Sequence, residues 1–218
     1  MVAASRKGRT IFINCPFDAQ YRPIFDAIVF TAAYSGFRVV CALSENDSMK
    51  VRVHKILDMT RACSLGIHDI SRTETDPGSG LPRFNMPFEL GLFFGMAYSA
   101  GNSPTKRGLI LDKKRYQYHQ FLSDLSGNDI AVHANKPIAA IKAIRDWLAP
   151  MDPARQLTGS DAIAKAFRRF EGHLSAHARG HGFAAPRDVT FVERLKLTLA
   201  WLDAQRRLGT PHPQRPRK

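Results

Sequence analysis

Short apolar runs alternate along most of this chain with longer segments whose apolar residues recur at helical spacing. Most of the short runs are apolar on both faces, which is typical of buried parallel strands. They span residues 10–14, 37–43, 65–70, 108–112 and 129–133. Between them, the spacing predicts helices over residues 21–35, 49–63, 86–99 and 138–148. This alternation favours a parallel sheet with helices on both faces.

Five strand–helix units joined by right-handed crossovers predict an α/β fold, a flavodoxin-like five-stranded parallel sheet with strand order 2-1-3-4-5. In an open parallel sheet, ligands bind beyond the carboxyl ends of the strands, at the point where the winding direction reverses. Here that point lies between the first and third strands. Site residues should therefore gather at the ends of those two strands.

After Pro150 the pattern changes to two helices, expected over residues 160–177 and 188–208, and then to a Pro- and Arg-rich end. The sequence thus predicts three regions. They are an α/β domain over residues 1–150, a C-terminal helical appendage over residues 151–209 and a disordered basic tail over residues 210–218.

The last predicted helix carries one apolar stripe, formed by Phe191, Val192, Leu195, Leu199 and Leu202. Burial of each such side chain is worth about 1.5–3 kcal/mol, so the stripe must pack on the core or on a second copy of the chain. We therefore expect a homo-oligomer.

The formal net charge is +13, from 32 Lys and Arg against 19 Asp and Glu, which favours anionic partners. Residues 151–218 carry 13 basic and 6 acidic side chains, a larger excess for their length than in the rest of the chain. Nucleic acid is therefore a candidate partner of the basic C-terminal region. A solvated basic face with a frayed end is the simpler alternative.

The three cysteines are Cys15, Cys41 and Cys63; they form no CxxC pair and are odd in number. This disfavours a disulfide framework and a cysteine zinc site, so no metal site is expected. The longest apolar stretches, such as residues 86–100, are too short to cross a bilayer, and no secretory leader opens the chain. We expect a cytoplasmic protein without membrane contact.

The first strand ends in a turn that contains a proline and several groups capable of binding a ligand. Such a turn is rigid and directs hydrogen-bonding groups into the crevice. Its candidate substrate-binding residues are Asn14, Cys15, Phe17, Asp18 and Tyr21. Cys15 is alternatively a small core side chain, and Asp18 a helix cap. The glycine-rich phosphate motifs GxGxxG and GxxxxGK[ST] are absent.

Two further strand ends offer candidate residues. Because side chains alternate along a strand, Asp69 and Ser71 share a face and His68 points the other way, so a His68–Asp69 catalytic pair is not expected. We expect Asp69 and Ser71 near the ligand, Arg72 in contact with a phosphate, and His68 in a structural role. After the fourth strand, Tyr116 is a candidate for stacking on a base, although exposed tyrosines are common.

The densest signal is the segment around Asn85 and Glu89, in which Asn85 and a nearby proline predict a helix start. Glu89 would then lie in the first turn, beside the crevice and in the positive field of the helix N-terminus. That field is worth about 0.3–1 kcal/mol, so Glu89 should be ionised at neutral pH unless burial dominates. A glutamate that only complements the helix dipole is the alternative, but a charge that opens an otherwise apolar helix needs another reason.

The strand end at Asp69 and Ser71, followed by the helix start at Glu89-Leu90-Gly91, resembles the nucleoside 2-deoxyribosyltransferases and the related TIR-like domains, over about residues 9–150. Residues 11–18 and 85–89 are also similar to segments of bacterial TIR-like proteins, which are often suspected of phage defence. The chain departs from the deoxyribosyltransferase pattern at Asn85-Met86-Pro87, where that family usually has Gly-Thr.

This resemblance implies cleavage of an N-glycosidic bond in a nucleotide, with NAD+ as the first candidate substrate and no cofactor. Glu89 would be the catalytic carboxylate. The residues around the sugar would be Asn14, Asp18, Asp69, Ser71 and Asn85. A non-catalytic sensor or adaptor that binds a nucleotide signal or nucleic acid is the rival prediction.

The chemistry constrains what the carboxylate must do. Breaking the bond builds positive charge on the anomeric carbon, which a fixed carboxylate stabilises or attacks to give a glycosyl-enzyme. Nicotinamide leaves NAD+ as a neutral molecule, whereas a purine needs a proton, for which Asp69 or Asp18 with a raised pKa is the candidate donor. A Glu89 carboxylate buried against an arginine or facing bulk solvent would count against catalysis.

Overall fold

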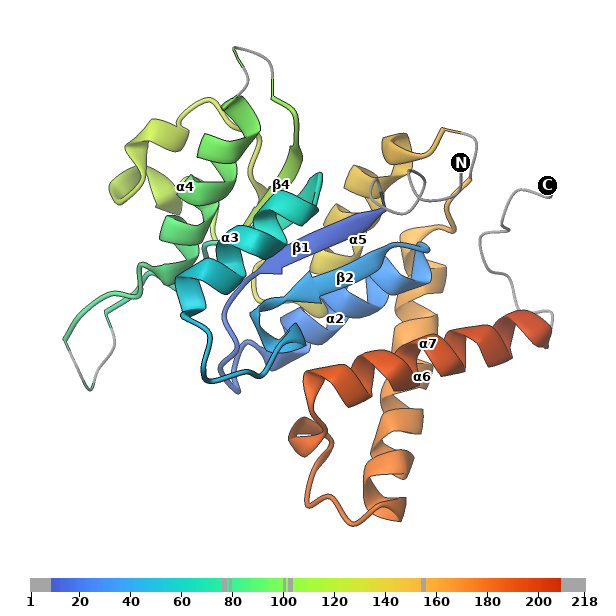
Figure 1. The fold of residues 1–218 in the computed structure, drawn as a ribbon. Coiled ribbons are helices and arrows are strands. Elements are labelled where there is room, and N and C mark those ends of the chain that lie inside the picture. The colour runs from blue at the N-terminus through green and yellow to red at the C-terminus, as the bar shows by residue number, and fades with distance from the viewer. Residues whose placement is uncertain are drawn as a thin grey trace. The chain divides into compact units, whose positions relative to one another are not determined.

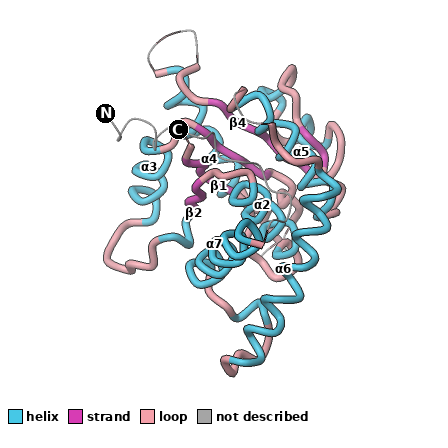
Figure 2. The backbone as a smooth tube through the Cα atoms, turned by 90° about the vertical axis from the view of Figure 1, so that its right-hand side faces the viewer, coloured by secondary structure: helices cyan, strands magenta, loops and turns pink. Residues whose placement is uncertain are grey.

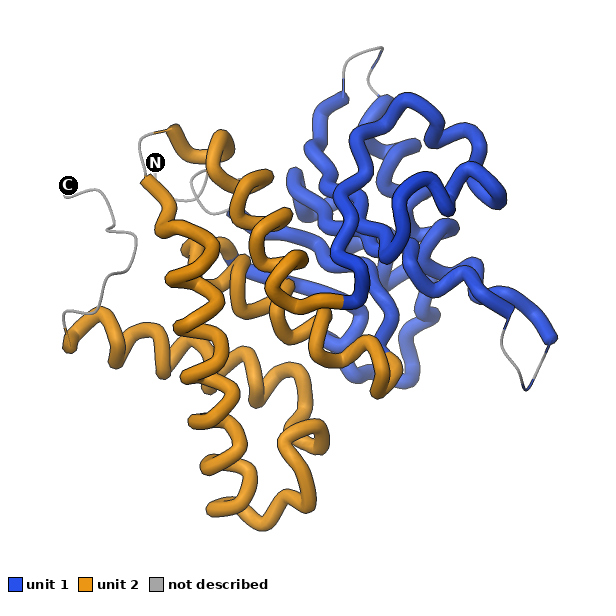
Figure 3. Tube along the Cα trace, turned by 180° about the vertical axis from the view of Figure 1, so that it is seen from behind, with its two compact units in different colours: residues 1–17, 38–135 blue, residues 18–37, 136–218 orange. Residues whose placement is uncertain are grey.

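The computed structural model describes residues 9–75, 78, 80–99, 101, 104–153 and 156–208. Contacts divide the chain into two compact units: unit 1 comprises residues 1–17 and 38–135, and unit 2 comprises residues 18–37 and 136–218 (Figure 3). This division differs from a boundary at residue 150, because two helices that alternate with the strands in sequence group with the C-terminal helices. The predicted tail, residues 210–218, lies outside the described residues.

Within the described residues, unit 1 contains one all-parallel sheet with the order β2-β1-β3-β4-β5, which confirms the predicted fold class and strand order (Figure 1). Its strands are β1 (Thr10–Asn14), β2 (Arg38–Cys41), β3 (Leu65–Asp69), β4 (Arg107–Asp112) and β5 (Ala131–Val132). β3 is buried along its whole length and β1 along all but its first residue, as expected of runs that are apolar on both faces.

The register of the sheet brings the polar ends of its strands to one edge. Asn14 at the end of β1 pairs with His68 of β3, and Asp112 at the end of β4 pairs with Val132 of β5. The chain moves from β1 outward to β2 and returns to β3 on the other side of β1, so the winding reverses between β1 and β3. A ligand site is expected at this edge.

Two helices of unit 1 pack on the sheet, α3 (Arg52–Ala62) and α4 (Asn85–Tyr98). An apolar cluster that includes Phe12 of β1, Ile56 of α3 and Phe93 of α4 joins these three elements. α4 approaches β3 so closely that a Cβ atom at Gly66 would lie 2.7 Å from the Phe93 ring and 2.5 Å from His68 Nε2. Glycine at position 66 therefore permits the approach of α4.

The start of α4 differs from the prediction. The helix begins at Asn85, so Glu89 is its fifth residue and lies just beyond the first turn. Although its sequence is mostly apolar, α4 is not buried on all sides, because Phe88 is 58% exposed and Tyr98 is 47% exposed. One face of α4 is buried, and Glu89 belongs to it.

The described residues of unit 2 form helices and their connections, and these helices are cyan in Figure 2. The α-helices of unit 2 are α2 (Arg22–Tyr34), α5 (Pro137–Leu148), α6 (Ser160–Gly180) and α7 (Phe191–Arg207). They share an apolar core in which Phe30 of α2 contacts the rings of Phe167 and Phe170 of α6 and Trp201 of α7. The two C-terminal helices, α6 and α7, thus belong to a single packed body with α2 and α5.

The predicted apolar stripe of α7 is only partly buried. Phe191 and Leu202 are buried, whereas Val192 is 39% exposed and Leu199 is 47% exposed. The buried face instead includes Arg194, which lies three residues after Phe191 and therefore on the same side of the helix. A polar side chain thus occupies a position on the inner face that the apolar pattern does not reveal.

The described residues show neither a membrane-spanning helix, nor a disulfide bond, nor a cluster of metal-binding side chains. Among the described residues, no helix is both long enough and apolar enough to cross a bilayer. Cys15, Cys41 and Cys63 are buried and form no disulfide with one another. No cluster of three or more His, Cys, Asp or Glu side chains that could hold a metal ion occurs in the described part of the chain.

Candidate functional site

Asn14 connects the end of β1 to the start of α4 through a hydrogen bond. Its Nδ2 atom donates a hydrogen bond to the carbonyl oxygen of Met86 at 2.8 Å and lies 3.2 Å from Nδ1 of His68. All three residues are buried. The first turns of α4 are therefore held beside the strand ends between which the winding reverses, which is the predicted position of the site.

His68 serves this arrangement as a neutral ring. Burial lowers the pKa of His68 to about 3, so its Nδ1 atom can accept the hydrogen bond from Asn14. The ring also packs on Phe93 of α4, with ring centroids 4.5 Å apart. These contacts agree with the structural role expected for His68.

A cavity of about 210 Å³ lies between the first turns of α3 and α4. Its lining consists of Arg52, Val53, Ile56, Asn85, Phe88 and Glu89. Two predicted site residues, Asn85 and Glu89, therefore meet here. The volume is below the roughly 300–1,000 Å³ of most small-molecule sites, so the cavity suits one end of a ligand rather than a whole dinucleotide.

Glu89 is the buried acid of this cavity, with a side chain that is 9% exposed. Burial raises the pKa of Glu89, and the nearby Arg52 guanidinium opposes that rise. The effect of burial on this pKa thus outweighs that of the arginine. A carboxyl group with a raised pKa changes between its protonated and ionised forms at a pH closer to neutrality than an exposed glutamate does.

Arg52 is the part of the site that sequence reasoning missed. Its Nη2 atom lies 3.5 Å from Oε1 of Glu89, whereas charge-assisted hydrogen bonds are about 2.7–2.9 Å long. An arginine beside the carboxylate is the arrangement expected to count against catalysis, and Arg52 occupies that position. Its side chain is 59% exposed, however, so the contact is loose and open on the arginine side.

A second polar cluster lies at the ends of β3, β4 and β5. It consists of Asp69, Asp112 and His133, each at most 1% exposed. His133 Nε2 lies 3.0 Å from Oδ2 of Asp69, and His133 Nδ1 accepts a hydrogen bond from the backbone N–H of Asn135 at 3.1 Å. The Nδ1 atom of His133 is thus occupied and its Nε2 atom faces the Asp69 carboxylate, so His133 lies beside Asp69 within the cluster.

Asp112 in this cluster has a carboxylate that is only half satisfied. Its Oδ1 atom accepts the backbone N–H of Lys113, while Oδ2 is buried without a hydrogen-bond partner. Burial raises the pKa of Asp112 to about 6, with the charge of Asp69 adding to the rise. Asp112 and His133 were not predicted, although both end predicted strands and the carboxyl ends of parallel strands share one edge.

The other predicted residues of unit 1 do not line the Glu89 cavity. Asp69 is fully buried, and its Oδ1 atom accepts the backbone N–H of Ser71 at 2.9 Å, so these two residues brace the end of β3. Cys15 is buried, which agrees with its interpretation as a small side chain of the core. Phe17 and Arg72 are half-buried.

Asp18 and Tyr21 belong to unit 2. Asp18 Oδ1 accepts the backbone N–H of Tyr21 at 3.0 Å, which supports the turn before α2. Asp18 is not the cap of this helix, because the N-cap residue is Tyr21. Tyr21 itself is buried. Tyr116 lines a second cavity of unit 1, whose lining includes neither Glu89 nor Asn85.

No protein-family model matches the chain, and no curated protein matches its sequence.

Proposed function

We propose that unit 1 cleaves the N-glycosidic bond of a nucleotide, with NAD+ as the first substrate to test and Glu89 as the catalytic carboxylate. The observation that carries this proposal is the buried Glu89 carboxylate in the lining of a cavity next to the start of α4, which Asn14 ties to the reversal point of the sheet. The resemblance of the surrounding motifs to TIR-like domains and nucleoside 2-deoxyribosyltransferases gives the same reaction class.

In the proposed reaction, the bond between the anomeric carbon and the base nitrogen breaks, and its electron pair leaves with the base. The ionised Glu89 carboxylate stabilises the positive charge left on the sugar, or bonds to the anomeric carbon until water replaces it. Among the described residues that line the cavity, Glu89 is the only acid. A leaving group that needs no proton, such as nicotinamide, therefore suits this cavity better than a purine.

Arg52 supports a substrate that carries a phosphate. A guanidinium binds a phosphate through two parallel hydrogen bonds, which is a better contact than the 3.5 Å approach to Glu89. A phosphate at the mouth of the cavity would draw Arg52 away from Glu89 and leave the carboxylate to face the sugar. This favours a nucleotide over an uncharged nucleoside.

The same contact favours a second function, a non-catalytic nucleotide sensor. A carboxylate that stays paired with an arginine recognises a ligand rather than stabilising a cation, because its charge is already balanced. In that case, ligand binding would leave the glycosidic bond intact.

The experiment that separates these functions follows free base by chromatography after the full chain is incubated with NAD+ and, separately, with common nucleosides. Catalysis predicts nicotinamide and ADP-ribose from NAD+, and little base from the purine nucleosides. Saturable binding of NAD+ without base release would favour the sensor. If the chain neither binds NAD+ nor releases base from it, both functions are contradicted.

Three sequence expectations accompany this proposal: a cytoplasmic protein that acts in phage defence, as the resemblance implies; nucleic acid as a partner of the basic C-terminal region; and a homo-oligomer. Exposed cations on α6 and α7, among them Lys165, Arg168 and Arg207, support a polyanion partner. A steep fall of nucleic-acid affinity with salt would test that partner. Light scattering of the full chain would test the homo-oligomer.

A further inference from the structure

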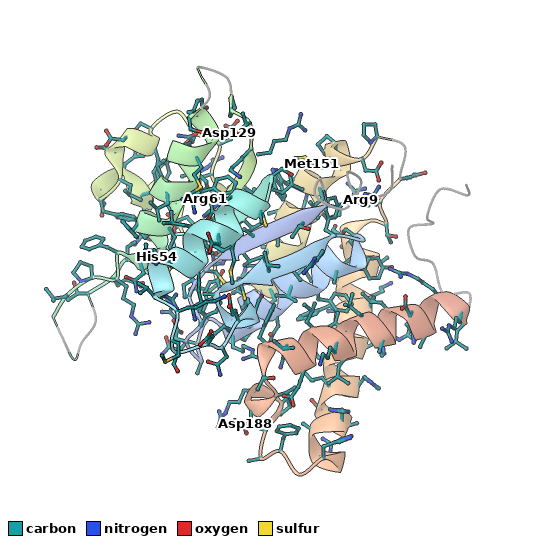
Figure 4. All side chains as sticks on the ribbon, viewed as in Figure 1. Arg9, His54, Arg61, Asp129, Met151 and Asp188 are labelled. Carbon is teal, nitrogen blue, oxygen red and sulfur yellow. The ribbon has the colours of Figure 1, made fainter. Side chains whose placement is uncertain are left out.

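The second cavity of unit 1 has a chemistry of its own. It measures about 250 Å³ and is lined by residues 114–116 after β4, by Tyr118, and by residues 128–132, which lead into and include β5. It shares no lining residue with the Glu89 cavity. In Figure 4, Asp129 of this lining lies well apart from His54, which belongs to the first turn of α3 at the other cavity.

Tyr116 is presented to solvent by a backbone conformation that a tyrosine rarely adopts. Its φ of 60° and ψ of 7° lie in the left-handed region, and Tyr116 as a whole is 60% exposed. Residues with side chains occupy this region at an energetic cost, and such residues concentrate at functional sites. An exposed aromatic ring held in this way needs a reason beyond packing.

The turn around Tyr116 is anchored on both sides. Before it, the Asp112 carboxylate accepts the backbone N–H of Lys113 at 2.6 Å. After it, Tyr118 is buried in a core cluster with Ile110 of β4 and Leu90 of α4. The exposed ring is therefore carried by a segment with fixed ends, and a ligand that stacks on it would meet a preorganised surface.

Cations accompany the ring. The Arg115 guanidinium lies 5.5 Å from the centroid of the Tyr116 ring, and Lys114 lines the same cavity. Within the described part of the chain, neither cation takes part in an ion pair that would occupy it. Asp129 adds one carboxylate to the lining. The cavity thus offers an aromatic face, two positive charges and an acceptor for hydrogen bonds.

We infer that this cavity binds a nucleoside monophosphate, independently of the reaction proposed for Glu89. The base would stack on Tyr116, the phosphate would contact Lys114 and Arg115, and Asp129 would accept hydrogen bonds from ribose hydroxyls or an exocyclic amine. An inorganic phosphate would leave the aromatic face unused. A ligand that carries negative charge along its whole length would be repelled by the carboxylate of Asp129.

The test is isothermal titration of the full chain with AMP, adenosine and inorganic phosphate. AMP should bind at least about tenfold more tightly than either fragment, since only AMP engages both the ring and the cations. Tyr116→Asn should weaken AMP binding about tenfold or more, because it removes the ring while asparagine tolerates the left-handed conformation. Tyr116→Phe should retain the affinity.

Matched variants locate the ligand. Tyr98→Asn, which removes an exposed tyrosine from α4, should leave AMP affinity unchanged. The double variant Lys114→Ala/Arg115→Ala should bind AMP about tenfold more weakly, and it decides the question if Tyr116→Asn fails to fold. No saturable AMP binding, or equal AMP affinity in the double variant and the wild type, would overturn the inference.

Discussion

Glu89 of unit 1 and Asp26 of unit 2 are both buried acids that face an arginine, yet their surroundings differ. Glu89 lines a cavity, and its partner Arg52 is 59% exposed and 3.5 Å away. Asp26 is ion-paired with Arg194, and both side chains are at most 6% exposed. Arg22 of the same helix also donates to Asp26 at 3.0 Å.

The two pairs share their electrostatics and differ in access. Burial raises the pKa of both acids, and in each case an arginine opposes the rise. In unit 2 the pair connects α2 with α7 inside the packed helices, so it contributes to the stability of that unit. In unit 1 the arginine side of the pair is open, so a ligand can replace the arginine. Solvent access, rather than charge, distinguishes a structural pair from a candidate site.

The largest effect is expected when the closed pair is broken. Arg194→Met leaves the Asp26 carboxylate buried with one cation fewer, which should lower the free energy of unfolding by about 3–5 kcal/mol. Urea denaturation measures this loss. Arg61→Met is the matched control, because Arg61 pairs with Asp58 on an exposed surface and such pairs contribute about 1 kcal/mol or less. Equal losses in both variants would remove the contrast.

Asp112 extends the comparison to a buried acid without an arginine. Its pKa is raised to about 6 in the folded chain, above the ordinary value of 3.8, so the folded state loses stability as the pH rises between these two values. Asp112→Asn removes the ionisation and should stabilise the fold by about 2–3 kcal/mol at pH 8, with little effect at pH 3.5.

Urea denaturation of wild type and Asp112→Asn at both pH values measures this difference. A gain that does not depend on pH would show that the ionisation of Asp112 is not its cause. A loss at pH 8 would show that the folded state needs the charge.

The smallest change in stability is expected when the open pair is broken. Arg52→Ala should alter the free energy of unfolding by no more than about 1 kcal/mol, because Arg52 is mostly exposed. The pKa of Glu89 should rise further, since Arg52 is the group that opposes the effect of burial. Carboxyl carbon resonances of Glu89 followed by NMR across pH would report the shift. A fall in that pKa would contradict the pairing.

The sheet could be predicted because its strands are short, apolar on both faces and separated by helical patterns. β1, for example, coincides with the predicted residues 10–14. The error at α4 has a local cause. The first backbone N–H groups of a helix have no acceptor within the helix, so Pro87 fits as the third residue as well as near the first, and its position does not fix the helix start.

The contacts of the site were harder to predict, since they join residues far apart in sequence. The expectation that His68 does not pair with Asp69 is confirmed. The histidine that contacts Asp69 is His133, which follows β5 near the C-terminal end of unit 1. Arg52 reaches Glu89 only because the first turns of α3 and α4 line one cavity. Helical spacing identifies each helix but does not show which of their ends meet.

The most direct test of the central claim compares base release from NAD+ by wild type, Glu89→Gln and Glu45→Gln, each shown by circular dichroism to be folded. Glu45 is the control because it is an acid of the same unit that lies outside the cavity and pairs with Lys50. If Glu89 supplies the transition-state charge, Glu89→Gln should lower turnover about 100-fold or more while Glu45→Gln retains the wild-type rate. Equal rates in the two variants would contradict the assignment of Glu89.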